Sequence, residues 1–126
     1  MGIHVEWDDV EQTIIRWDFE PQWDWNDFWA AFDSSIKLAG SSTYRMDVIP
    51  NVINSKRLPI GALGAFKSID TKLPEFTKLV VVAGPDSMTS VMIKTFAQIN
   101  RIESWRTAKT LDEARVIIHK DRQANG

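Results

Sequence analysis

Histidine and cysteine, two residue types that often carry out catalysis, are scarce in this chain. The chain has two histidines and no cysteine, and the lack of cysteine excludes disulfides, thiolate metal sites and cysteine nucleophiles. His4 falls in a predicted edge strand, and His119 falls in the polar part of the last predicted helix. Ligands of open α/β sheets bind where the carboxyl end of a strand meets a helix. We therefore expect both histidines to be surface residues and not general bases.

None of the common catalytic or metal-binding motifs occurs in the sequence. It contains no G-x-S-x-G, H-E-x-x-H, P-loop or G-x-G-x-x-G segment. The run G-A-L-G at residues 61–64 falls inside a predicted helix and not in a turn that could cradle phosphate. Asp8, Asp9 and Glu11 are clustered, but they lack the spacing and the glycine of a calcium-binding loop. We expect no enzymatic activity, no cofactor and no bound metal.

The candidate binding surface consists of polar residues that an α/β fold would gather at its strand ends. Most of them lie in and after the third predicted strand, and two follow the fourth. Residues 84–87 (G-P-D-S) precede a predicted helix, whose free amide groups could hold an anion, although Asp86 as the helix cap is the simpler interpretation. The full set is Asp47, Asn51, Asn54, Ser55, Arg57, Asp86 and Ser87.

The charge of the chain argues against a nucleic-acid partner. The isoelectric point is about 5.6, and the net charge is −2. In the last segment basic residues alternate with acidic ones, as on a solvated helix face. Residues 1–33 contain nine acids and a single base, Arg16. This asymmetry has two interpretations. The acids form one docking face, or folding intersperses them with the basic residues of the rest of the chain on an ordinary solvated surface. We favour the second interpretation.

The composition is that of a globular protein. The chain has 126 residues, of which 44% are hydrophobic and 25% charged, and this length suits one domain spanning residues 1–126. No apolar run approaches the roughly 20 residues that a membrane span requires. The first residues do not combine a basic segment with an apolar one. We expect a cytoplasmic protein without a membrane span.

Residues 79–84 (L-V-V-V-A-G) form the segment around which the predicted fold is organised. This run offers no polar side chain to either face of a strand, so we expect an interior strand, parallel to a neighbour. Two earlier segments, 3–7 and 13–19, alternate apolar and polar residues and predict a hairpin at the edge of the sheet, with its turn at Asp8 and Asp9.

A change of period after residue 24 predicts the first helix. Asp24 is a suitable N-cap, Asp27 sits where a carboxylate favours the helix dipole, and Gly40 ends the segment. The apolar residues of this helix either pack against the sheet or line a ligand cavity, and packing is the favoured interpretation. They are Trp25, Phe28, Trp29, Phe32, Ile36 and Ala39.

The remaining segments predict further alternation of strands and helices. We expect a strand over 44–49 closed by Pro50, a helix over 59–71, a strand over 102–107, and a last helix capped by Thr110 that frays near Asp121. The helix after Asp86 is predicted to bury Met88, Val91, Met92, Phe96 and Ile99. The result is an α/β fold with a mixed, mainly parallel five-stranded sheet and about four helices.

This order of elements resembles the STAS fold of bacterial anti-sigma-factor antagonists and their STAS-like relatives. The matching features are W-D-W at 23–25, G-A-L at 61–63, a strand ending in Gly84, and T-L-D-E-A at 110–114. The resemblance spans roughly residues 3–120. It implies a STAS-like fold and a role in protein interaction.

One feature of the family is missing from this sequence. Phosphorylatable STAS regulators carry a serine at the start of the helix that follows the third strand. Here Leu58 and Pro59 stand at that place, and the nearest hydroxyl belongs to Ser55, whose simpler interpretation is a turn or solvent contact. Regulation by phosphoserine is therefore not expected.

Two functional hypotheses follow. The first is a non-catalytic STAS-like interaction or regulatory module that binds a protein partner, or a second copy of itself, through residues 51–64. The alternative is a carrier of a small molecule or lipid, in which Trp25, Trp29, Phe32, Met88 and Met92 line a cavity. A hydrolytic enzyme is the third and weakest hypothesis.

Overall fold

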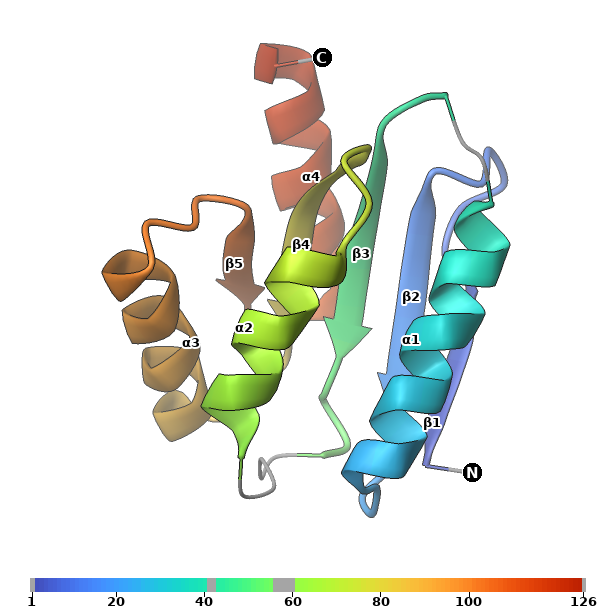
Figure 1. Cartoon of the computed structure of the whole chain (residues 1–126). Coiled ribbons are helices and arrows are strands. Elements are labelled where there is room, and N and C mark those ends of the chain that lie inside the picture. The colour runs from blue at the N-terminus through green and yellow to red at the C-terminus, as the bar shows by residue number, and fades with distance from the viewer. Residues whose placement is uncertain (1, 41–42, 56–60, 126) are drawn as a thin grey trace.

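The computed structural model describes residues 2–40, 43–55 and 61–125, with the side chain of Leu63 excepted. Its elements follow the predicted order of strands and helices (Figure 1). They are β1 (Ile3–Trp7), β2 (Ile14–Phe19), α1 (Trp25–Ala39), β3 (Met46–Asn51), α2 (Ala62–Lys72), β4 (Thr77–Ala83), α3 (Ser87–Ile99), β5 (Trp105–Ala108) and α4 (Leu111–Asn125).

The five strands form one mixed sheet in the order β1-β2-β3-β4-β5. β1 and β2 are antiparallel, as expected for a hairpin, and the pairs from β2 to β5 are parallel. β4 lies between β3 and β5, which confirms the prediction of an interior strand. A side chain at Gly84, just after β4, would approach the Ile53 backbone to 2.9 Å, and the φ angle there is 78°, so this turn requires glycine.

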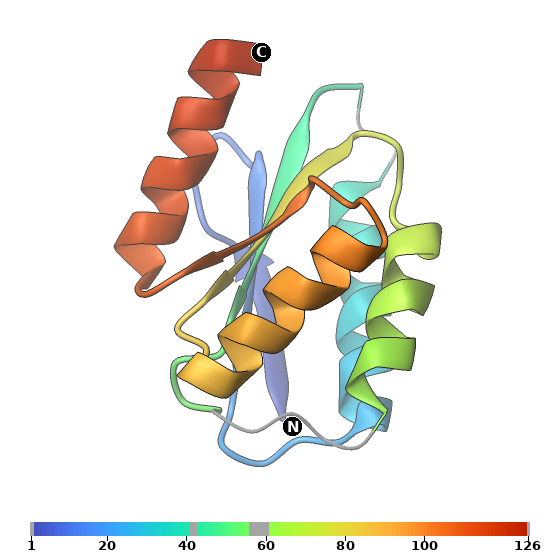
Figure 2. The same cartoon turned by 90° about the vertical axis from the view of Figure 1, so that its left-hand side faces the viewer.

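The helices cover the two faces of the sheet unequally (Figure 2). The chain crosses the sheet in one direction, and parallel connections are almost always right-handed, so α1, α2 and α3 lie on the same face. Their apolar side chains and those of the sheet form an aromatic-rich core. Among the described helices, only α4 packs on the opposite face, over a smaller cluster that includes Ile49, Val81 and Ile118.

The local signals of α1 are confirmed. The Asp24 carboxylate accepts from the Asp27 amide, the Asp27 carboxylate accepts from the Asp24 amide, and the amide of Gly40 donates to the carbonyl of Ile36. Phe28 and Phe32 are buried against the sheet. Most of the aromatic stripe is therefore core, which was the favoured interpretation.

Several predicted strand boundaries are wrong. β3 begins at Met46 and not at Tyr44. β3 does not stop before Pro50 but continues to Asn51, because a proline next to the strand end removes few ladder hydrogen bonds. β5 begins at Trp105 and not at Ile102. The amide of Ile102 instead donates to the carbonyl of Ala97 at 2.8 Å, so this residue completes the end of α3.

The predicted buried face of α3 is correct at Phe96 and in part at Met92, and wrong at its other three positions. Met88, Val91 and Ile99 are 77%, 63% and 74% exposed. The buried residues are Thr89, Ile93, Phe96 and Ala97. Phe96 packs against Phe66 and Trp105 at ring-centroid distances of 5.6 Å, and this contact turns the other apolar stripe of the helix outward.

α4 continues to Asn125, past Asp121 where the sequence predicts fraying. Its last turns are held by Arg122, whose Nε donates to the Asp47 carboxylate at 2.9 Å and whose Nη2 donates to the carbonyl of Thr13 at 3.1 Å. Asp47 is completely buried, and it also accepts from the Leu79 amide at 2.9 Å. A buried carboxylate requires such partners, so this contact fixes the end of α4 on the sheet.

We predict that Arg122→Met destabilises the protein by about 1.5–3 kcal/mol, because it removes a charged hydrogen-bond partner from a buried carboxylate. The measurement is the free energy of unfolding in urea. Lys120→Met removes a positive charge from an exposed position of the same helix and should change stability by less than about 0.5 kcal/mol. Equal stability of the two variants would contradict the anchoring role of Arg122.

Candidate functional site

The structure does not gather the predicted site residues into one surface. Asp47 is the second residue of β3 and Asn51 is its last, so the two lie about 13 Å apart along the strand. Asp47 is therefore placed wrongly by the prediction: it is near the amino end of its strand, and its carboxylate serves α4. The Asn51 side chain lies on the same face of the sheet, where its Nδ2 donates to Asp18 Oδ1 at 2.9 Å.

The loop after β3 divides the next candidates. Asn54 is exposed, whereas Ser55 is buried and its Oγ accepts from Trp23 Nε1 at 2.6 Å. Arg57 lies outside the described residues. Ser55 is thus part of the packing between this loop and the entrance of α1, which agrees with a structural interpretation of the hydroxyl.

The two candidates after β4 behave as a helix start. The Asp86 carboxylate accepts from the Thr89 amide at 2.7 Å, which confirms that Asp86 is the N-cap of α3, and Ser87 is the exposed first residue of that helix. The cap places negative charge at the positive end of the helix dipole. An anionic ligand would be repelled there.

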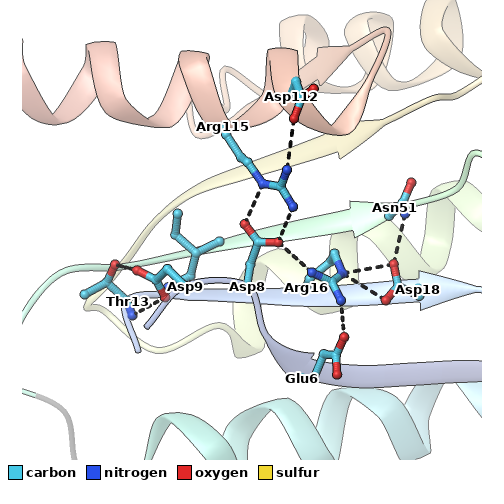
Figure 3. A network of polar contacts seen from close by, with 10 residues as sticks. Glu6, Asp8, Asp9, Thr13, Arg16, Asp18, Asn51, Asp112 and Arg115 are labelled. Atoms are coloured by element: carbon cyan, nitrogen blue, oxygen red, sulfur yellow. Dashed lines mark hydrogen bonds and ion pairs between the residues drawn. The ribbon is translucent and has the colours of Figure 1, made fainter. Parts of the chain in front are cut away.

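A charged network joins α4 to the hairpin on the second face of the sheet (Figure 3). The Asp8 carboxylate accepts from Arg16 Nη1 at 2.6 Å and from Arg115 Nε and Nη2 at 2.9 and 2.8 Å. Further carboxylates surround the two guanidinium groups. The remaining members are Glu6, Asp18, Asn51 and Asp112.

The network keeps Asp8, Arg16 and Arg115 ionised. The hydrogen bond from Arg115 is the main cause that holds the pKa of Asp8 below its usual value; burial opposes this effect and Arg16 reinforces it. The bond to Asp8 likewise raises the pKa of Arg115. Burial lowers the pKa of Arg16, but Asp18 and Asp8 outweigh it and raise the value overall. None of these groups is poised to exchange protons near neutral pH, so the network is structural.

This network involves part of the acidic N-terminal segment. Asp8 and Arg115 are 107 positions apart in the sequence and meet directly. Glu6 and Asp18 instead pair with Arg16, the base of their own segment. The mixing of acids with the basic remainder, which is the favoured interpretation, is therefore seen at Asp8.

The surface best suited to binding is a groove between α2 and α3, which lie side by side in both views (Figures 1 and 2). We call it the α2–α3 groove. Its volume is about 520 Å³, and its described lining residues include no acid. A Cβ at Gly64 would meet no atom within 4 Å, so this glycine leaves the groove open. The lining residues are Gly64, Lys67, Met92, Thr95, Phe96, Ile99 and Asn100.

Sequence analysis missed this groove because it assigned the apolar stripe of α3 to the core. The helix carries two apolar stripes at helical spacing. One consists of Met88, Val91, Met92 and Ile99. The other begins one residue after Met92 and consists of Ile93, Phe96 and Ala97. A helix that is apolar on two sides has two surfaces to cover. Recognising both stripes is the signal that could have indicated an exposed one.

The structure adds no evidence for catalysis or metal binding. Both histidines are exposed, and the residues described contain no cluster of three or more acidic or histidine side chains suited to a metal ion. None of the described helices has the length and apolarity needed to cross a bilayer. No protein-family model, curated protein or solved structure matches the chain. Functional inference therefore depends on the chemistry of the groove and the core.

We predict that Asp8→Asn destabilises the protein by about 1.5–3 kcal/mol at pH 7 and that this difference shrinks in acid. The pKa of Asp8 is lower in the folded than in the unfolded protein, so its stabilisation is complete above pH about 4 and is lost as the pH falls through the folded pKa. The measurement is the free energy of unfolding in urea from pH 7 to pH 2.5.

Asp112→Asn is the matched control, because this carboxylate also pairs with Arg115 but its side chain is 92% exposed. It should change stability by less than about 0.5 kcal/mol. The role given to Asp8 is wrong if Asp8→Asn costs the same at pH 2.5 as at pH 7.

Proposed function

We propose that this protein is a non-catalytic STAS-like interaction module that binds a partner protein in the α2–α3 groove. The observation that carries the proposal is the outward apolar stripe of α3. A contiguous apolar surface rimmed by polar residues is typical of protein interaction sites. The element order, with an edge hairpin followed by parallel strands and helices, supports the STAS-like part of the proposal.

The groove has the features of a site for an amphipathic helix. Met92, Phe96 and Ile99 offer apolar contacts, and the open position at Gly64 allows close approach. Such grooves bind helices through anchors spaced three or four residues apart. The partner segment should therefore present an apolar stripe.

The charges around the groove indicate an acidic partner. Lys67 lines the groove, and the described lining residues include no acid. A two-fold interface between copies would place the same surface against itself and so put a positive charge from each copy into an interface without an acid. A different protein with carboxylates beside its apolar stripe fits better.

Among the described residues of the predicted docking segment, 51–64, the groove is lined by Gly64 alone. Gly64 lines the groove, whereas the Asn51 side chain lies on the opposite face of the sheet. Residues 56–60 lie outside the described part of the chain. The proposed surface is therefore centred on α3 and not on the loop.

The alternative of a small-molecule or lipid carrier receives little support. Of the five residues expected to line a cavity, Trp25 lines the one beneath the helices, whose volume is about 60 Å³, and Trp29, Phe32, Met88 and Met92 do not. Sites for drug-sized ligands have volumes of roughly 300–1,000 Å³. The aromatic stripe of α1 serves mainly as core.

We predict that Thr95→Asp and Ile99→Asp each weaken partner binding at least tenfold while the fold is retained, because each puts a charge into the groove. Val116→Asp is the matched control, since Val116 is 49% exposed on α4. Candidate partners are the proteins that the wild type and the control retain from a host lysate and the groove variants do not. These proteins are then cross-linked through a photoreactive group at Met92.

The cross-linked segment should be amphipathic and acidic, and its affinity for the wild type should fall with added salt. Circular dichroism checks that the variants are folded. Cross-links between two copies of this chain, or equal retention by all variants, would overturn the proposal.

A further inference from the structure

The edge strand β1 has one side without a neighbouring strand (Figure 1). Within the described ranges, β1 pairs with β2 alone. It contains neither proline nor lysine, and its register with β2 continues without a bulge, so it lacks several of the features that keep edge strands from pairing. β5, the other edge strand, has only four residues and carries the exposed Arg106.

The hydrogen bonds of the hairpin indicate which backbone groups of β1 face this open side. The amide of Asp8 donates to the carbonyl of Ile14, and the amide of Glu20 donates to the carbonyl of Gly2, both at 2.8 Å. Residues 2 and 8 therefore turn their backbone groups toward β2. The orientation alternates along an antiparallel strand, so residues 4 and 6 do the same. The groups that face the open side are the N–H and C=O of Ile3, Val5 and Trp7.

We propose that two copies of this protein pair through β1 in antiparallel orientation, so that their sheets join into one continuous sheet. A two-fold axis makes such an interface pair the same surface with itself. An axis at Val5 places Val5 opposite its counterpart and Ile3 opposite Trp7 of the second copy. All the outward backbone groups of β1 then exchange hydrogen bonds. The pairing uses the opposite edge of the sheet from α3 and is independent of the α2–α3 groove.

The side chains of β1 complement themselves in this register. His4 lies opposite Glu6 of the second copy, in a pair without backbone hydrogen bonds, where side chains are closest. His4 uses Nε2 for Glu20, and Glu6 uses Oε1 for Arg16, so Nδ1 and Oε2 are left for this contact. A protonated imidazole can donate to two carboxylates at once. An axis at His4 or at Glu6 would place like residues opposite each other, so the axis at Val5 is favoured.

A groove beside β1 makes room for the largest side chain of this interface. Its volume is about 270 Å³, and its lining residues on α1 include the small Ala30, Ala31 and Ser34. Ile3 lines it from β1, so Trp7 of the second copy, opposite Ile3, would lie next to it. Trp7 is only partly buried in the single chain, and pairing would cover more of its apolar surface. Because both copies gain this contact, a second copy fits better than an unrelated strand.

Analytical ultracentrifugation of the full chain tests the pairing, and two charge variants test its register. We expect a dimer with a dissociation constant in the micromolar range, as for a small interface. His4→Glu and Glu6→Lys each place like charges opposite each other and should weaken dimerisation at least tenfold. An equimolar mixture of these two variants has opposite charges in both pairs and should dimerise again. Glu11→Lys, the matched control at an exposed turn position, should change nothing, and neither should Ile99→Asp in the other groove.

Disulfide formation shows which residues meet. The chain has no cysteine, so Val5→Cys introduces a single thiol. The Cα atoms of a hydrogen-bonded pair are about 5.5 Å apart, within the range that a disulfide spans, so this variant should oxidise to a covalent dimer. His4→Cys is the control, because its two copies would lie diagonally, about 7–8 Å apart, although position 4 is more exposed.

Circular dichroism checks that all variants are folded. Three results would each overturn the inference: a wild type that is monomeric at millimolar concentration, a mixture of the charge variants that does not dimerise, or equal oxidation of the two cysteine variants.

Discussion

The second face of the sheet depends on the hydrogen bonds that the buried carboxylate of Asp47 accepts. It receives the amide of Leu79 from β4 and the guanidinium of Arg122 from α4, and Arg122 in turn binds Thr13 just before β2. α4 adds few large apolar side chains to its core cluster. The helix is therefore held by charge at two points two turns apart, Arg115 and Arg122, with Ile118 between them.

Much of the fold could be predicted because its signals are local. Caps at Asp24, Asp86 and Thr110 mark helix starts, and the run at 79–84 marks an interior strand. The buried face of α3 could not be predicted, because the helix has two apolar stripes one residue apart and both fit the helical period. The contact of Phe96 with Trp105 decides which stripe is buried. Asp47 is a similar case, since its partner Arg122 lies 75 positions away.

The groove and the cavity share a thin aromatic wall. Phe96 lines the groove and packs on Phe66 and Trp105, which both line the cavity. The spacing of α2 and α3 is therefore set by rings that contact both spaces. The groove is thus lined by Met92, Phe96 and Ile99, which the sequence pattern had assigned to the core.

The order of the strands in the sheet, which equals their order in the chain, has a consequence for synthesis on the ribosome. Each strand can join the edge formed by the preceding one as soon as it emerges, so no strand has to wait for a distant neighbour. The carboxylates of Asp8 and Asp47 are exceptions, because their α4 partners are translated only after all five strands. A nascent sheet therefore lacks Arg115 and Arg122 until α4 is synthesised, and α4 can dock only after the five strands have been made.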